Sequence, residues 1–171
     1  MLIARPAPDE FAQWYADYIA EVPGDDALAV LVASRAKTAA LLAGIPAAKA
    51  GHRYAEGKWT VREVVGHVTD AERIFSYRVL RIARGDTTPL ASFDENVYVP
   101  EARFEERSLA DIAAELGTVR DATLSLLRGL DPDRLARRGV ASNKPVSARA
   151  IAWIIAGHEL HHLRVLGEKY L

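Results

Sequence analysis

The chain has 171 residues, half of them hydrophobic, which is enough for one core and too short for two full domains without a clear linker. Its formal net charge is −1 with acidic and basic residues interspersed, so neither a nucleic acid nor a membrane surface is an expected partner. It contains no cysteine, which excludes disulfides, thiolate metal sites and a cysteine nucleophile. We therefore expect a single domain over residues 1–171, in which any metal is held by His, Asp or Glu.

Helical periodicity dominates almost every segment, and the alternation typical of strands is scarce, so the fold class predicted is all-α. A short first helix is predicted over residues 9–19, and Gly24 follows it as a break. A second helix is predicted over residues 25–42 and ends at "GIP". No apolar run approaches the ~20 residues that span a bilayer, and the N-terminus lacks the apolar region of a signal peptide. These features predict a soluble, cytoplasmic protein.

The third helix is predicted to begin after Thr60, which stands three residues before Glu63 in the spacing of a capping box. It should run to Arg84, with Gly85 as its C-cap. Residues 85–107 then lack a long periodic pattern. A segment of this length is either a lid or binding loop, or a plain connector across the end of a bundle.

The fourth helix is predicted from Ser108, as N-cap, to about Gly129. The last helix is predicted from Ser147, also as N-cap, to about Lys169. Together these elements predict an up-and-down four-helix bundle with a short extra N-terminal helix and one long crossover loop.

The last helix carries three of the five histidines, in "IIAGHELHHLRVL". His158 and His162 fall on its apolar stripe, whose other members are Ile151, Ile154, Ile155 and Val165. A buried imidazole needs a hydrogen-bond partner or a metal, and two at i and i+4 converge on one point. This pair therefore predicts a metal site. His161 lies at the flank of the stripe and is not expected to be a primary ligand.

A third ligand must come from another helix, and the chain offers His52 and His67. His52 lies in a glycine-bracketed loop and is expected to be solvated. His67 lies at the edge of the third helix's apolar stripe, with Glu63 and Asp70 nearby to orient its ring. Taken alone, His67 would be a structural or a surface residue, but together with the pair it is the predicted third ligand. Three histidines without cysteine fit zinc, nickel or another borderline divalent ion, and they leave a position for water or substrate.

The letters "HELHH" also match H-E-x-x-H, the zinc motif of metallopeptidases. Only nine residues follow His162, and Val165 and Glu168 stand where the metzincin extension has glycine and histidine. Glu159 lies about 100° from His158 around the helix, so we expect it to face away from the metal. A peptidase is therefore disfavoured.

Three stretches resemble the DinB/YfiT-like superfamily of metal-binding four-helix bundles: "GKWTVREVVGHVTDAERIFSYRVLRIARGDTTPL", "FDENVYV" and "IAGHELHHLRVLGEKYL". The similarity covers nearly the whole chain. The family pattern of one histidine on the second bundle helix and H-x-x-x-H on the last falls on His67, His158 and His162. The resemblance implies one divalent ion, zinc or nickel. It also implies a low-molecular-weight thiol as a candidate cofactor, since similar members are transferases that use bacillithiol or mycothiol.

Two functions are predicted from this pattern. The first is a metal-dependent enzyme, a thiol S-transferase or a hydrolase, that acts on a small molecule. The second is a metal-binding stress-response or interaction protein without turnover. A closed coordination sphere favours the second function, and an accessible water on the metal favours the first.

Substrate contacts are predicted from polar and aromatic residues near the third helix: Asp70, Glu72, Arg78, Phe93 and Tyr98. Glu72 and Arg78 equally fit an ion-pair set on the helix surface. The segment 85–107 is expected either to fold over the metal end of the bundle, with Phe93 as an apolar anchor and Tyr98 as a polar contact, or to pack on a second subunit. Both readings place it outside the hydrophobic core. Resemblance and aromatic helix faces predict a homodimer.

Overall fold

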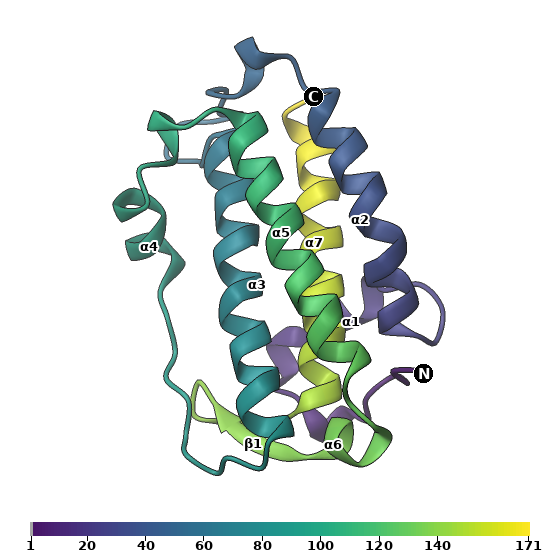
Figure 1. Cartoon of the computed structure of the whole chain (residues 1–171). Coiled ribbons are helices and arrows are strands. Elements are labelled where there is room, and N and C mark those ends of the chain that lie inside the picture. The colour runs from purple at the N-terminus through teal and green to yellow at the C-terminus, as the bar shows by residue number, and fades with distance from the viewer. Residues whose placement is uncertain (1) are drawn as a thin grey trace.

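Four long helices dominate the computed structural model, which describes residues 2–171 (Figure 1). They are α2 (Ala27–Ala43), α3 (Val61–Ala83), α5 (Leu109–Arg128) and α7 (Ala148–Lys169). Helices α2 and α3 each pack on both α5 and α7, so these two consecutive helices lie at opposite corners of the bundle. A long crossover follows α3 and returns the chain to the starting end, so that α3 and α5 run in the same direction (Figure 1). The predicted all-α four-helix bundle is confirmed.

The predicted caps account for the ends of the long helices. The hydroxyl of Thr60 accepts the backbone N–H of Glu63, and the Glu63 carboxylate accepts the N–H of Thr60 at 2.6 Å. Ser108 and Ser147 cap α5 and α7 in the same way through their hydroxyl oxygens. Gly85 follows α3 with a φ of 84°, a left-handed conformation that glycine adopts without strain.

The N-terminal segment differs from the continuous helix predicted over residues 9–19. It forms 3₁₀ turns at Pro8–Glu10 and Gln13–Tyr15, and only then the short helix α1 (Ala16–Glu21). Between the two turns the backbone of Phe11 is extended, with φ −152°. Glu10 stabilises this arrangement, because its buried carboxylate accepts hydrogen bonds from Ser147 and Arg149 at the start of α7.

A two-stranded hairpin, which the periodicity did not predict, closes one end of the bundle. It comprises β1 (Arg138–Ala141) and β2 (Lys144–Ser147) and follows the short helix α6 (Pro132–Ala136). Its turn consists of Ser142 and Asn143, both with positive φ, the conformation that suits a two-residue hairpin loop.

The crossover between α3 and α5 contains the short helix α4 (Glu95–Glu101) and a 3₁₀ turn at Phe104–Glu106. Helix α4 stands beside α3, outside the four-helix bundle (Figure 1). Leu90, Val99 and Phe104 are nevertheless buried, at 8%, 2% and 4% exposure. The expectation that this segment lies outside the hydrophobic core is therefore wrong for these three side chains, which anchor it to the bundle.

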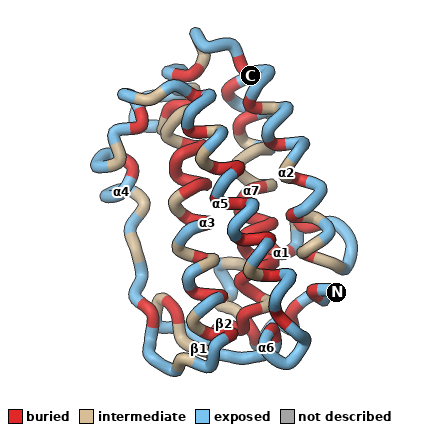
Figure 2. Tube along the Cα trace, in the orientation of Figure 1, coloured by how far each residue is buried: buried red, intermediate tan, exposed pale blue. Residues whose placement is uncertain are grey.

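Buried residues line the inner faces of the long helices, and α7 is buried over most of its first half (Figure 2). The buried set includes a charged group, Arg120 of α5, whose guanidinium binds both carboxylate oxygens of Glu72 at 2.7 and 2.8 Å and Glu159 at 3.0 Å. Burial alone would lower the pKa of Arg120, but the hydrogen bonds and charges of the two carboxylates outweigh it and raise the pKa. Glu72 is thus neither a pocket group nor part of a surface ion pair with Arg78.

Ser34 and Thr38 of α2 complete this buried network by donating their hydroxyls to Glu159, at 2.7 and 2.8 Å. The network therefore joins side chains from all four long helices.

In residues 2–171 none of the helices is long and apolar enough to cross a bilayer.

Candidate metal centre

The histidines of α3 and α7 meet where these two helices pack against each other. His67 lies on the second turn of α3, and His158 and His162 lie one turn apart on α7. Nε2 of His158 is 3.0 Å from Nε2 of His67 and 3.2 Å from Nε2 of His162. One nitrogen from each residue lies within 4.8 Å of the others, a spacing that can hold one metal ion. The structure thus brings together the three residues that the sequence predicted, hereafter the three-histidine cluster.

His67 and His158 are buried and His162 is partly buried, and this burial keeps the three imidazoles neutral. Desolvation lowers the pKa of His67 to about 4 and that of His162 to about 3, and the negative charge of Glu95 opposes the shift at His67. Desolvation, reinforced by the other histidines, lowers the pKa of His158 well below its usual value. Neutral imidazole is the form that binds a metal, because its free nitrogen carries the lone pair.

The hydrogen-bonding capacity of His158 tests whether the cluster fits a metal. An imidazole nitrogen either donates one proton or accepts through one lone pair. Nε2 of His158 faces two other ring nitrogens and can satisfy only one of them fully. A divalent cation among the three nitrogens would use all three lone pairs at once, so the donor set fits a borderline divalent ion such as zinc or nickel.

Aromatic rings hold the imidazoles in place. The ring of Trp59 lies 4.8 Å from that of His67, between centroids, and the ring of Phe75 lies 5.8 Å from that of His158. Tyr18 of α1 forms a T-shaped contact with His158, with ring centroids 5.5 Å apart. These contacts come from α1, α3 and the segment before α3, so the cluster is enclosed by elements distant in sequence.

A glycine precedes the histidine in both motifs, and each glycine admits a neighbouring element. A Cβ on Gly157 would lie 2.0 Å from the backbone oxygen of Tyr18, so α1 touches α7 directly beside His158. A Cβ on Gly66 would lie 2.4 Å from the ring of Phe104, which packs beside His67. The dipeptide "GH" is not a specific sequence signal for this close packing, because it also occurs at Gly51–His52, where the histidine is exposed.

The other two histidines lie outside the cluster. His161 has its Nδ1 3.4 Å from Glu21 and 3.3 Å from Arg164, on the flank of α7. His52 is exposed in the loop before α3. We predicted that neither His52 nor His161 is a primary metal ligand. This stays a prediction, and the positions of the two residues agree with it.

Three carboxylates near the histidine motifs are used elsewhere. Glu159 points to Arg120 and α2, so it is not placed as the general base of a peptidase. Glu63 closes the helix cap and Asp70 pairs with Arg73 at 3.5 Å. Within residues 2–171 no hydrogen bond joins Glu63 or Asp70 to His67, so the expectation that one of them orients this ring is not met.

The predicted substrate contacts lie at different depths. Phe93 packs edge-to-face with Phe75, with ring centroids 6.3 Å apart, and Phe75 in turn contacts His158. Tyr98 lies beyond Phe93, with ring centroids 5.7 Å apart, and is 45% exposed. Arg78 is buried farther along α3, where it donates to the backbone oxygen of Ala91. The crossover thus reaches the cluster through aromatic contacts.

Glu95 is a residue near the cluster that the sequence analysis did not single out. It lies in the first turn of α4 and is half-buried. Its negative charge partly offsets the desolvation that lowers the pKa of His67, and it adds to the desolvation that raises the pKa of Tyr18. Its position in "FDENVYV" was visible, but nothing local distinguishes it from the neighbouring acidic residue, Asp94, which caps α4.

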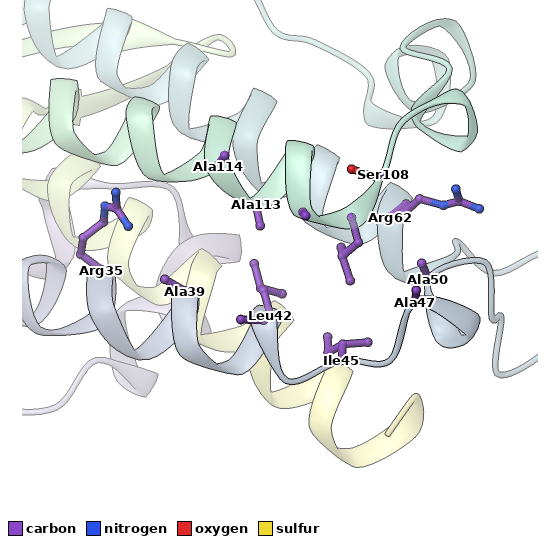
Figure 3. A pocket seen from close by; sticks show the side chains of 13 residues that line it. Arg35, Ala39, Leu42, Ile45, Ala47, Ala50, Arg62, Ser108, Ala113 and Ala114 are labelled. Carbon is purple, nitrogen blue, oxygen red and sulfur yellow. The ribbon is translucent and has the colours of Figure 1, made fainter.

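A separate cavity of about 520 Å³ lies between α2 and α5 (Figure 3). Alanines form much of its wall, and Arg35 and Arg62 lie at its opposite ends. None of the three histidines lines it, so it is not part of the candidate metal centre.

Comparison with known proteins shows the family to which this chain belongs. The model of the DinB superfamily matches residues 31–166. The chain belongs to the DinB superfamily. Among curated proteins, no sequence matches this DinB chain.

Solved structures of similar fold agree with the DinB assignment. One is YfiT from Bacillus subtilis, described as a probable metal-dependent hydrolase with an unusual four-helix bundle topology. Its TM-score is 0.76 at 19% identity, over 95% of this chain and 89% of that chain. A mycothiol-dependent maleylpyruvate isomerase gives 0.68 at 14% identity, over 88% of this chain and 66% of that chain. A DinB-like protein of Bacillus subtilis, YjoA, gives 0.59 at 20% identity, over 82% and 86%. These TM-scores show that the chain shares the fold of these proteins.

Proposed function

We propose that this protein is a metal-dependent enzyme that acts on a small molecule, as a hydrolase or as a thiol S-transferase. The observation that carries the proposal is the convergence of three neutral histidine nitrogens within 4.8 Å of one another. Two relatives of the same fold support it, since one is described as a probable metal-dependent hydrolase and the other as a mycothiol-dependent isomerase.

His67, His158 and His162 would hold one ion of zinc or nickel. Closed structural zinc sites generally use four protein ligands, whereas catalytic sites use three and leave a position for water or substrate. In residues 2–171 the group consists of these three side chains. A bound divalent ion would supply Lewis acidity, which lowers the pKa of a water or thiol and makes it a nucleophile at neutral pH.

The surrounding side chains have a positioning role in this proposal. Trp59 and Phe75 fix the planes of His67 and His158, and Tyr18 closes the side toward α1. The low exposure of His67 and His158 limits their contact with bulk water, which strengthens electrostatic interactions around them. A low-molecular-weight thiol is proposed as the co-substrate of the transferase reading, on the resemblance to thiol-dependent members of the family.

One observation favours the alternative of a metal-binding protein without turnover. His67 and His158 are only 7% and 6% exposed, and aromatic rings pack against both. A site enclosed in this way suits metal storage or a structural ion as well as catalysis.

Activity of metal-reconstituted protein separates these functions. The protein is stripped with a chelator, reloaded with zinc or nickel, and assayed with a panel of ester and amide substrates and with bacillithiol, mycothiol and glutathione plus an electrophile. We expect turnover that requires the ion, is lost in His162→Ala and is retained in His161→Ala, the matched control on the same helix. Full metal loading without turnover on either panel would favour the non-catalytic alternative.

A further inference from the structure

Arg78 of α3 is a buried cation without an acidic partner. It is 3% exposed, and its Nη2 donates to the backbone oxygen of Ala91 at 2.6 Å and to the hydroxyl of Ser142 at 3.2 Å. Among residues 2–171, no carboxylate forms an ion pair with Arg78, whereas the other buried arginine, Arg120, binds two. Burying a charge without a counter-ion is costly, so an unpaired guanidinium at this depth calls for an anion.

The surroundings of Arg78 form a cavity rather than a packed interior. A space of about 460 Å³ lies between α3 and the crossover segment, within the size range of small-molecule sites. The lining includes three arginines of α3 and aromatic rings of α3, the crossover and α4: Arg73, Arg78, Arg81, Tyr77, Phe93 and Tyr98. It therefore combines positive charge with aromatic walls.

Only one of the three arginines is free to neutralise a ligand. Arg73 pairs with Glu115 at 2.6 Å, and Arg81 pairs with Asp86. Arg78 has only neutral acceptors, with the rings of Phe75 and Phe93 5.8 and 5.7 Å from its guanidinium carbon. The cavity thus presents one uncompensated positive charge beside an apolar wall.

We propose that this cavity binds a small organic carboxylate, with Arg78 as its counter-ion. A single uncompensated charge matches a monovalent acid better than a phosphate, which carries about −1.5 to −2 at neutral pH. The guanidinium charge attracts a carboxylate, which would accept from the N–H groups of Arg78 that Ala91 and Ser142 leave free, and the aromatic walls accept an apolar body. The site is distinct from the candidate metal centre, since none of the three histidines lines the cavity.

Binding of phenylacetate, measured by ligand-observed NMR titration, tests the proposal, with phenylacetamide as a neutral probe of the same shape. We expect a dissociation constant of about 1 mM or below for the acid in the wild type, and binding at least about tenfold weaker for the amide. Equal binding of acid and amide, or no binding of the acid up to about 10 mM, would overturn the proposal. Displacement of phenylacetate by inorganic phosphate at lower concentration than by acetate would contradict the carboxylate preference.

Variants test the role of Arg78 itself. Arg78→Met should weaken phenylacetate binding at least about tenfold, and Arg78→Lys, which keeps the charge, should weaken it less. Arg81→Met is the matched control, since that arginine lines the same cavity but is already paired, and it should change binding by less than about twofold. Circular dichroism verifies folding. A loss of phenylacetate affinity in Arg81→Met as large as in Arg78→Met would contradict the role assigned to Arg78. If the Arg78 variants unfold, the comparison of phenylacetate with phenylacetamide in the wild type decides whether the cavity prefers a carboxylate.

Discussion

Glu10 shows how one buried carboxylate organises the N-terminal segment. It is 2% exposed and accepts hydrogen bonds from the hydroxyl of Ser147 at 2.6 Å, from Nε of Arg149 at 2.7 Å and from the backbone of Ala7 at 3.0 Å. Burial alone would raise the pKa of Glu10, but these donors outweigh it and lower the pKa to about 2. The fold therefore binds the ionised form.

The lowered pKa predicts a pH-dependent contribution to stability. The ordinary pKa of the group is 4.5, so the contribution is complete above that pH and is lost as the pH falls toward about 2. We expect Glu10→Gln to lower the free energy of unfolding by about 2 kcal/mol at pH 7, with the difference shrinking in acid. Denaturant titrations across pH measure it. The control is Asp9→Asn, an exposed neighbour, and an undiminished difference near pH 2 would contradict the account.

Arg120 carries the second prediction at this scale. Arg120→Ala leaves Glu72 and Glu159 buried without their cation, so we expect a loss of about 3–5 kcal/mol in the free energy of unfolding. Arg35→Ala breaks an ion pair with Asp121 at the surface and should cost at most about 1 kcal/mol. Chemical denaturation measures both, and similar losses in the two variants would show that the buried network contributes no more than a surface pair.

Among the elements, the contact between α1 and α7 depends on Gly157. A Cβ there would meet the backbone of Tyr18 at 2.0 Å, and backbone cannot rotate aside as a side chain can. We expect Gly157→Ala to destabilise the protein by about 1–3 kcal/mol and to speed hydrogen exchange in α1.

Gly167 is the matched control for that substitution, since it lies on the same helix with nothing within 4 Å of an added Cβ. Gly167→Ala should stabilise the protein by up to about 1 kcal/mol through helix propensity alone. If Gly157→Ala were also stabilising, α1 would not pack on α7 as described.

The long helices were predictable from sequence because their signals are local. The caps at Thr60, Ser108 and Ser147 and the glycine after α3 lie within a few residues of the ends they define. The hairpin and α4 were missed because they are short and lack periodicity. The break in the predicted first helix was missed because Glu10 bonds with residues more than a hundred positions away.

The candidate site was predictable where its signals are local in the sequence. It was missed where it depends on contacts between distant residues. His158 and His162 follow from spacing on one helix, and His67 followed from the need for a third ligand. The true partners of Glu72 and Glu159 did not follow, because Arg120 reaches them across the bundle. The sequence also did not predict that Arg78 lacks a carboxylate partner, because this depends on the positions of the acidic residues around it in the folded structure.

Across the whole molecule, the candidate metal centre joins two helices whose histidines are 91 positions apart in the chain. Helices α3 and α7 share an extensive contact, and the buried Arg120 network holds both of them to α2 and α5. An ion bound only by the folded protein would add to its stability, by an amount that grows with the logarithm of the ion concentration. The fold and the site are therefore expected to support each other.

Elemental analysis of the purified protein tests the central claim most directly. We expect about one zinc or nickel ion per chain in the wild type, and sharply lower content in His67→Ala, His158→Ala and His162→Ala. His52→Ala and His161→Ala, the two histidines outside the cluster, should retain the wild-type content. Metal content unchanged in all three cluster variants, or lost on replacing His52 or His161, would contradict the assignment of the three-histidine cluster as the metal centre.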